Sequence, residues 1–221
     1  MADFKTHTIA AAVVSGALTT AMLVHYQLSV ELALLYWAAG TLGGILPDID
    51  SDHSKSIRLI FQLLSGLATV IVVIKVHPYL KIWQLWLAGL GTFLIIYFPL
   101  RQIFARLTIH RGILHSLLAN LLFALITIVI GYRLLNMTAA IAWGCGLFLF
   151  IGALVHLLLD EIYSVDLAGA RLKGSFGSAL KITQWNEPWL TVVLIAACGG
   201  LYYLAPSGYH WWLLVSRLNP L

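Results

Sequence analysis

Residues 139–161 read AAIAWGCGLFLFIGALVHLLLDE, and this stretch decides the fold class of the chain. Its apolar run, from Ala139 to Leu159, has the length of about 20 residues that an α-helix needs to cross the ~30 Å hydrocarbon core of a bilayer. The run contains His156 near its end and is followed by Asp160. Ionisable side chains are costly inside a membrane, so these two residues are candidates for a functional site. The stretch predicts a transmembrane helix with polar chemistry at one end.

The rest of the chain has the same apolar character. Of its 221 residues, 61% are hydrophobic and only 10% are charged, whereas soluble domains carry roughly 25% charged residues. Six further apolar runs span Ile9 to Tyr26, Leu32 to Leu46, Leu59 to Val76, Ile82 to Leu100, Ile113 to Leu135, and Trp189 to Ala205. We therefore expect an all-α fold, a multipass transmembrane helical bundle of six to seven spans that forms a single domain over residues 1–221.

The distribution of positive charge predicts the orientation of this bundle. With the N-terminus inside and seven crossings, nine of the 13 Lys and Arg residues fall on the first face, which the positive-inside rule makes cytoplasmic. A long basic loop at about 164–188 lies on that face. The net charge of +4 is explained by attraction to anionic lipid, so we expect the bilayer as a partner and no direct contact with nucleic acid.

A cluster of carboxylates follows the second apolar run. The sequence GGILPDIDSDHSK, residues 43–55, places Asp48, Asp50 and Asp52 within five positions of one another. If the chain is extended after Pro47, Asp48 and Asp50 point the same way, and a divalent cation between them would cancel their repulsion. Asp52 has an alternative role as the N-cap of the third helix. An EF-hand is excluded, because its sixth and twelfth positions lack Gly and Glu.

Four groups of polar residues reach the same predicted membrane face. They are His7 at the start of the first run, the acidic cluster after the second, His110 and His115 at the start of the fifth, and His156 with Asp160 at the end of the sixth. Imidazole and carboxylate groups bind zinc, manganese and iron. His156 and Asp160 are four residues apart, so one side of a helix presents both. Convergence of these groups predicts a metal site near the cytoplasmic face.

Three cations near this face have two interpretations each. Arg111 stands between His110 and His115, where it could clamp a phosphate bidentately, although a single cation beside a span is often only a topology marker. Lys173 and Lys181 lie in the long basic loop and could guide an anionic head group, with simple lipid anchoring as the alternative.

The motifs THTIAA (6–11), GGILPDIDSD (43–52), HRGILHS (110–116) and HLLLDEIYSVDLAGARLKGSFGSALK (156–181) occur in this order. Together they resemble the YdjM-like family of bacterial inner-membrane proteins, described as metal-dependent hydrolases and as LexA-binding. The resemblance implies a multipass protein of the inner membrane and a LexA-type regulator as a partner. It also implies a hydrolase site built from His7, Asp48, Asp50, His110, His115, His156 and Asp160. The pattern is similar, more remotely, to helical zinc phospholipases C and nucleases, which cleave phosphoesters.

These observations predict a membrane-embedded, metal-dependent hydrolase that acts on a phosphoester of a lipid-like substrate. The expected cofactor is one to three divalent ions, zinc first, with manganese or magnesium as alternatives. Asp50, Asp52 and Arg111 are the candidate catalytic residues; Arg111, Lys173 and Lys181 are the candidate substrate-binding residues. The main alternative is a regulatory or scaffolding membrane protein with a structural or transported metal. A magnesium-dependent prenyl transferase is less consistent, because it predicts more Asp-rich motifs and less histidine.

Overall fold

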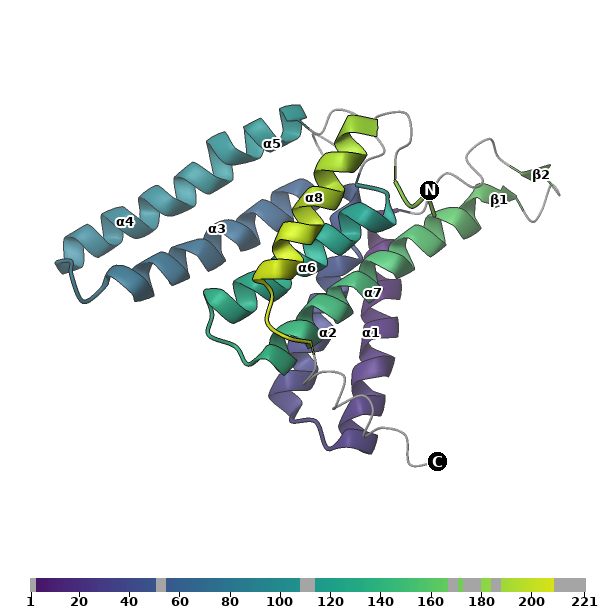
Figure 1. Ribbon diagram of the computed structural model, residues 1–221, viewed down its shortest axis with the longest axis horizontal. Coiled ribbons are helices and arrows are strands. Elements are labelled where there is room, and N and C mark those ends of the chain that lie inside the picture. The colour runs from purple at the N-terminus through teal and green to yellow at the C-terminus, as the bar shows by residue number, and fades with distance from the viewer. Residues whose placement is uncertain are drawn as a thin grey trace. The chain divides into compact units, whose positions relative to one another are not determined.

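The computed structural model describes residues 3–50, 55–107, 114–166, 171–172, 180–183 and 188–208. The α-helices are α1 (Phe4–Tyr26), α2 (Val30–Gly43), α3 (Lys55–Val76), α4 (Ile82–Ile95), α5 (Arg101–Leu107), α6 (Leu117–Arg133), α7 (Ala139–Ser164) and α8 (Pro188–Leu204). Beyond helix, the described residues form one short antiparallel pair, β1 (Val165–Asp166) with β2 (Arg171–Leu172), inside the predicted long loop. The predicted all-α class is confirmed (Figure 1).

Each of the seven predicted apolar runs contains a helix. Four helical segments are long and apolar enough to cross a membrane, as judged by length and composition: Phe4–Tyr26, Ser56–Val76, Ile82–Ala105 and Ala139–Tyr163. The apolar helices α2, α6 and α8 are shorter, with 14, 17 and 17 residues, or roughly 21 to 26 Å at 1.5 Å per residue. A helical membrane bundle is therefore supported, while the number of crossings depends on how the bilayer accommodates these three helices.

The region around Pro47 differs from the prediction. The second apolar run continues to Leu46, but α2 ends at Gly43 and is followed by a 3-10 helix, η1 (Leu46–Asp50). Pro47 has no backbone N–H to donate, so the α-helical ladder cannot run through it, whereas the start of a new short helix tolerates proline. The extended conformation under which Asp48 and Asp50 would point the same way is therefore not formed.

The fourth apolar run also continues further than predicted. After α4 the chain forms a π-helical turn, η2 (Ile96–Leu100), and then enters α5. Pro99 lies inside η2 and lacks the N–H that an α-helix would use there, which accounts for the local widening of the ladder. Arg101 lies over the ring of Tyr97, 4.7 Å from its centroid. The helical path therefore extends past Leu100 instead of ending there.

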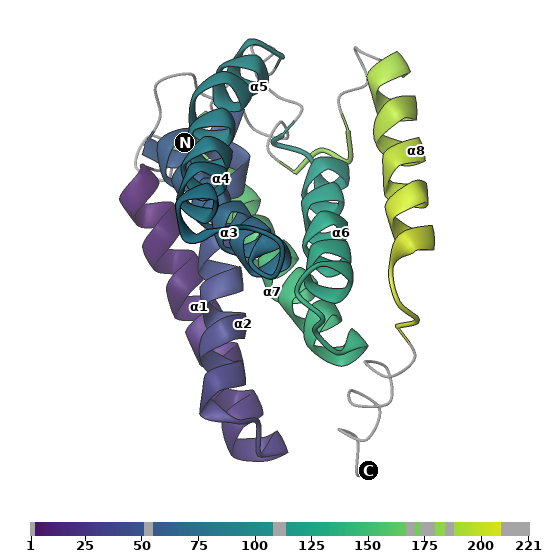
Figure 2. The same cartoon turned by 90° about the vertical axis from the view of Figure 1, so that its left-hand side faces the viewer.

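The chain divides into two compact units, which are described separately. The first contains the chain up to Pro47 and from Gly112 onward; the second runs from Asp48 to Arg111. In the first unit, α7 packs against α1, α2 and α6, and α8 packs on α6. Figures 1 and 2 show this arrangement, with α7 between the α1–α2 pair and α6. The prediction that all residues act as a single domain stays a prediction.

Small residues bring α2 and α7 into close contact in the first unit. A methyl group at Gly152 would overlap the carbonyl oxygen of Gly40, and one at Gly43 would overlap the carbonyl oxygen of Leu149. A methyl group at Gly44 would overlap the side chain of Ala11 on α1. Only glycine allows backbones to approach so closely. These contacts set the distance between α2 and α7 at the level of the candidate site.

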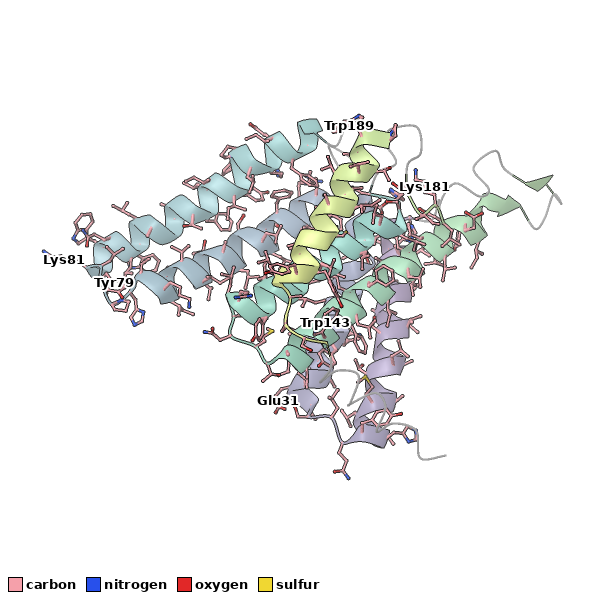
Figure 3. The ribbon with its side chains drawn as sticks, viewed as in Figure 1. Glu31, Tyr79, Lys81, Trp143, Lys181 and Trp189 are labelled. Atoms are coloured by element: carbon pink, nitrogen blue, oxygen red, sulfur yellow. The ribbon has the colours of Figure 1, made fainter. Side chains whose placement is uncertain are left out.

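The second unit contains a hairpin of α3 and α4. Thr69 Oγ1 donates to the carbonyl oxygen of Gly89 at 3.3 Å, which links the two helices. Tyr79 and Lys81 lie in the connection at the end of the hairpin (Figure 3). There Lys81 N donates to Gln84 Oε1 at 2.8 Å, which caps the start of α4.

Candidate metal centre

The first turn of α1 supplies His7. Asp3 is the N-cap of this helix, and its Oδ1 accepts hydrogen bonds from the hydroxyl and the backbone N–H of Thr6 at 2.6 and 2.8 Å. These two bonds lower the pKa of the Asp3 carboxyl below its ordinary value. The backbone N–H of His7 donates to the carbonyl oxygen of Asp3 at 3.1 Å. The cap therefore sets the conformation of the turn from which His7 reaches the interior.

Helix α7 supplies two further polar groups, His156 and Asp160. They are separated by one helical turn, and His156 Nε2 lies 3.5 Å from Asp160 Oδ2. The exposed fractions are 0% for His156 and 3% for Asp160. Buried ionisable side chains in an apolar helix need compensating partners, because their desolvation is costly.

The turn before α6 supplies His115. The helix begins at Leu117 with Ser116 as its N-cap, and Ser116 Oγ accepts from the backbone N–H of Ala119 at 3.3 Å. His115 is buried immediately before the cap, with 8% of its surface exposed. Because Ser116 caps the start of α6, the preceding imidazole of His115 lies at the N-terminal end of this helix.

The carboxylate of Asp160 is the point at which the three imidazoles meet. His7 Nε2 lies 3.2 Å from Asp160 Oδ1, and His115 Nε2 lies 3.7 Å from Oδ2. The rings of His7 and His156 are stacked, with centroids 3.6 Å apart and planes 13° apart. One ligand atom from each of His7, His156 and Asp160 lies within 4.8 Å of the others. These groups could hold a metal ion.

A backbone hydrogen bond sets the tautomer of His156. Its Nδ1 lies 2.8 Å from the carbonyl oxygen of Gly44, and a carbonyl only accepts, so Nδ1 carries a proton. In the neutral ring, Nε2 then presents a lone pair toward the carboxylate of Asp160. His7 Nδ1 is buried and has no hydrogen-bond partner among the residues that the structure describes. In each of the three histidines, the ring nitrogen that approaches the Asp160 carboxylate is Nε2.

The other predicted site residues belong to the second unit, lie outside the described residues, or, for Lys181, occupy the segment before α8. Asp48 is the first residue of the second unit, and Asp50 is the last residue of η1. Asp52, His110, Arg111 and Lys173 lie outside the described residues. Lys181 is described, and its backbone carbonyl accepts from Leu117 N at 3.0 Å. Figure 3 labels Lys181 and, at the start of α8, Trp189.

Two groups that support the histidines were not predicted from the sequence. The first is the carbonyl oxygen of Gly44, which no residue type could signal, because every residue has one. The second is Asn120, which is fully buried in α6 and bonds to the turn of His115. An Asn inside an apolar run is a detectable signal, because polar side chains are costly there.

The fold and the cluster define a helical integral-membrane protein with a buried His and Asp group that could hold a metal ion. A family model described as the YdjM inner membrane protein matches residues 1–218, and the chain belongs to that family. Family membership and the apolar helices support the predicted localisation in an inner membrane. No curated protein and no solved structure matches the chain.

Proposed function

We propose that the chain is a membrane-embedded, metal-dependent hydrolase that cleaves a phosphoester of a lipid-like substrate at the cytoplasmic interface. One observation carries the proposal: the Nε2 atoms of His7, His115 and His156 all approach the buried carboxylate of Asp160, at 3.2 to 3.7 Å. Three imidazoles and a carboxylate are a donor set that suits zinc, with manganese and iron as further candidates.

The chemistry of these donors fits a cation. The bond to Gly44 leaves His156 Nε2 with a lone pair, 3.5 Å from a carboxylate oxygen that also carries lone pairs. Two such acceptors repel each other unless a proton or a metal ion lies between them. His7 Nε2 lies 3.2 Å from the other oxygen of the same carboxylate, and its ring stacks on that of His156 with centroids 3.6 Å apart. A shared divalent ion satisfies all of these atoms at once.

The proposed ligands are His7, His115, His156 and Asp160, with His110, Asp48 and Asp50 as further candidates for up to three ions. Asp48 follows the buried Pro47 of the first unit directly in sequence. The carbonyl oxygen of Gly44 accepts a hydrogen bond from His156 Nδ1, as is typical of the partners of ligating histidines.

When bound, a divalent ion supplies an activated water and a Lewis acid for the phosphoryl group. The chain's own residues would orient the reactants around it. Arg111 is proposed to clamp the phosphate through two parallel N–H donors, and Asp50 or Asp52 to accept a hydrogen bond from the attacking water. Lys173 and Lys181 would attract the anionic head group to the cytoplasmic side.

The place of the cluster along its helices supports an amphiphilic substrate. His7 lies in the first turn of a candidate span, Phe4–Tyr26, and Asp160 lies in the last turns of another, Ala139–Tyr163. The ends of spanning helices lie at the depth of lipid head groups. A phosphoester that is anchored by acyl or isoprenoid chains presents its phosphate at the same depth.

The burial of the cluster favours a second candidate, a structural or transported metal in a regulatory or scaffolding protein. The four side chains are between 0% and 8% exposed, and four protein donors can complete a tetrahedral zinc site. Catalytic sites instead keep one position open to water. Retention of metal without hydrolysis would support this second function.

Metal analysis of the protein purified in detergent tests the proposal. We expect the wild type to retain zinc and His7→Ala to lose most of it, while His25→Ala, at the exposed far end of the same helix, retains it. Hydrolysis of phospholipid and isoprenoid phosphate substrates should be present in the wild type and abolished by a chelator. Equal metal content in all three proteins would refute the site, and a zinc-loaded protein without activity would refute the hydrolase.

A further inference from the structure

Asn120 is a polar side chain in the middle of an apolar environment. It lies in the first turns of α6 and is 0% exposed. Its Oδ1 has no hydrogen-bond partner among the residues that the structure describes. A buried acceptor left unsatisfied costs free energy that an apolar side chain at this position would avoid. Packing alone therefore does not explain an asparagine here.

The amide nitrogen of Asn120 reaches the backbone on both sides of His115. Nδ2 donates to the carbonyl oxygen of Ser116 at 2.9 Å and, through a longer and weaker bond of 3.5 Å, to that of Leu114. These two carbonyls belong to the residues immediately before and after His115. One side chain thus restrains the peptide group that precedes His115 and the one that follows its neighbour Ser116.

The opposite side of the same turn is held by backbone contacts. Leu117 N donates to the carbonyl oxygen of Lys181 at 3.0 Å, and Leu118 N donates to that of Ile182 at 3.1 Å. These bonds fix the start of α6, which directly follows the cap residue Ser116. These bonds do not involve the carbonyl of Leu114, which precedes His115 and accepts from Asn120 instead.

We propose that Asn120 is a positioning residue for His115 in the candidate metal centre. The inference rests on the proposed metal site and adds to it a residue outside the predicted ligand set. Asn120 acts through the two flanking carbonyls, so that His115 Nε2 is held in place near the carboxylate of Asp160 before an ion binds. Groups that orient ligands in this way change metal affinity by roughly 10- to 100-fold when they are removed.

A truncation series tests the proposal. Asn120→Ala should weaken zinc binding by roughly 10- to 100-fold and alter the visible absorption of the cobalt-substituted protein. Asn120→Ser should recover part of the loss, because a serine hydroxyl can donate to the carbonyl four residues earlier, which is that of Ser116. Thr127→Ala is the matched control on the same helix, since Thr127 Oγ1 donates to the carbonyl of Phe123 at 2.9 Å, away from the cluster. It should leave zinc affinity unchanged.

A double-mutant cycle separates positioning from general stability. In a His115→Ala background, Asn120→Ala should cause little further loss of zinc affinity, because its effect passes through His115. Full additivity would overturn the proposal. So would equal losses for Asn120→Ala and Thr127→Ala, or no recovery with serine. If Asn120→Ala does not fold, Asn120→Ser takes its place in the cycle with the same criteria.

A measurement without metal distinguishes this inference from the proposed function. In protein with ¹⁵N-labelled histidine, the ring signals assigned to His115 should shift in Asn120→Ala and stay in place in Thr127→Ala. If the wild type binds neither zinc nor cobalt, the proposed function fails, while these signals still test the positioning role. Unchanged His115 signals in Asn120→Ala overturn the inference whatever the metal content.

Discussion

At the scale of single residues, Asp160 determines the charge of the cluster. Three imidazole nitrogens lie 3.2 to 3.7 Å from its carboxylate oxygens, so Asp160→Asn keeps the size of the side chain but removes the negative charge that a cation requires. We expect bound zinc to fall to background. Excess zinc at about 100 times its dissociation constant should stabilise the wild type by about 2.7 kcal/mol and the variant not at all. Thermal unfolding with and without zinc measures this difference.

The adjacent carboxylate provides the control for this experiment. Glu161→Gln removes the same charge one residue further along α7 and should retain both zinc and the zinc-dependent rise in the thermal midpoint. If Asp160→Asn binds zinc as the wild type does, the carboxylate is not a ligand. In that case a hydrogen-bonded ion pair with protonated histidine becomes the better account of the contacts.

Residue types predicted part of this cluster and could not predict the rest. His7, His115, His156 and Asp160 could be singled out because imidazoles and carboxylates are rare and costly in apolar runs. The partner of His156 is a backbone carbonyl, that of Gly44, and its position depends on how closely two helices pack. Side-chain chemistry is visible in a sequence, whereas the distances between backbones are not.

At the scale of elements, hydropathy located the helices well and their ends poorly. The apolar runs predicted every long helix, because burial in lipid requires continuous apolar sequence. The end of α2 at Gly43 and the π-helical turn at η2 depend on single prolines and on hydrogen bonds that hydropathy does not register. The pairing of β1 with β2 is too short to produce a strand pattern.

The contact between α2 and α7 leads to a prediction at this scale. A methyl group at Gly152 would overlap the carbonyl of Gly40 and approach Gly44 N, so Gly152→Ala should separate the helices and lengthen the bond from His156 to Gly44. We expect a loss of roughly 1 to 3 kcal/mol in stability together with weaker zinc binding. Gly199→Ala on α8 is the control, because a methyl group there meets nothing within 4 Å among the described residues. Thermal unfolding and metal analysis of both variants measure the difference, and equal behaviour would contradict the role of the close contact.

The N-cap of α1 leads to a second prediction at this scale. Asp3→Ala removes the acceptor for Thr6, so the amides of the first turn, including that of His7, should exchange with deuterium several-fold faster. Asp3→Asn, which retains a capping oxygen, should exchange at nearly the wild-type rate. The pKa of Asp3 in the folded protein lies below its ordinary value of 3.8. The cap therefore stabilises the turn fully at pH values above 3.8, and this stabilisation is lost as the pH falls through the lowered pKa of the folded state. Hydrogen exchange across this range measures the change, and an unchanged rate in Asp3→Ala would contradict it.

At the scale of the whole molecule, the sequence grouped polar residues that lie far apart in the chain. The parity of the crossings assigned the starts of the first and fifth runs and the end of the sixth to the same predicted side, and the structure brings His7, His115 and Asp160 together in one unit. The order of the apolar runs along the chain is enough to predict which of their ends share a side. The order of the runs does not predict how the units are arranged, because the arrangement depends on packing between helices and not on hydropathy.

The orientation in the membrane gives the last prediction. With seven crossings, Lys5 and Lys181 face the cytoplasm and Lys81, in the connection of the α3–α4 hairpin (Figure 3), faces the opposite side. In a background with Cys145 and Cys198 replaced by alanine, Lys81→Cys should react with an impermeant maleimide in intact cells, and Lys5→Cys and Lys181→Cys only after permeabilisation. The length of α2 makes the result informative, because its 14 residues cover only about 21 Å. If Lys81→Cys instead reacts from the same side as Lys5→Cys, the chain crosses the membrane an even number of times between these residues, and the predicted orientation is wrong.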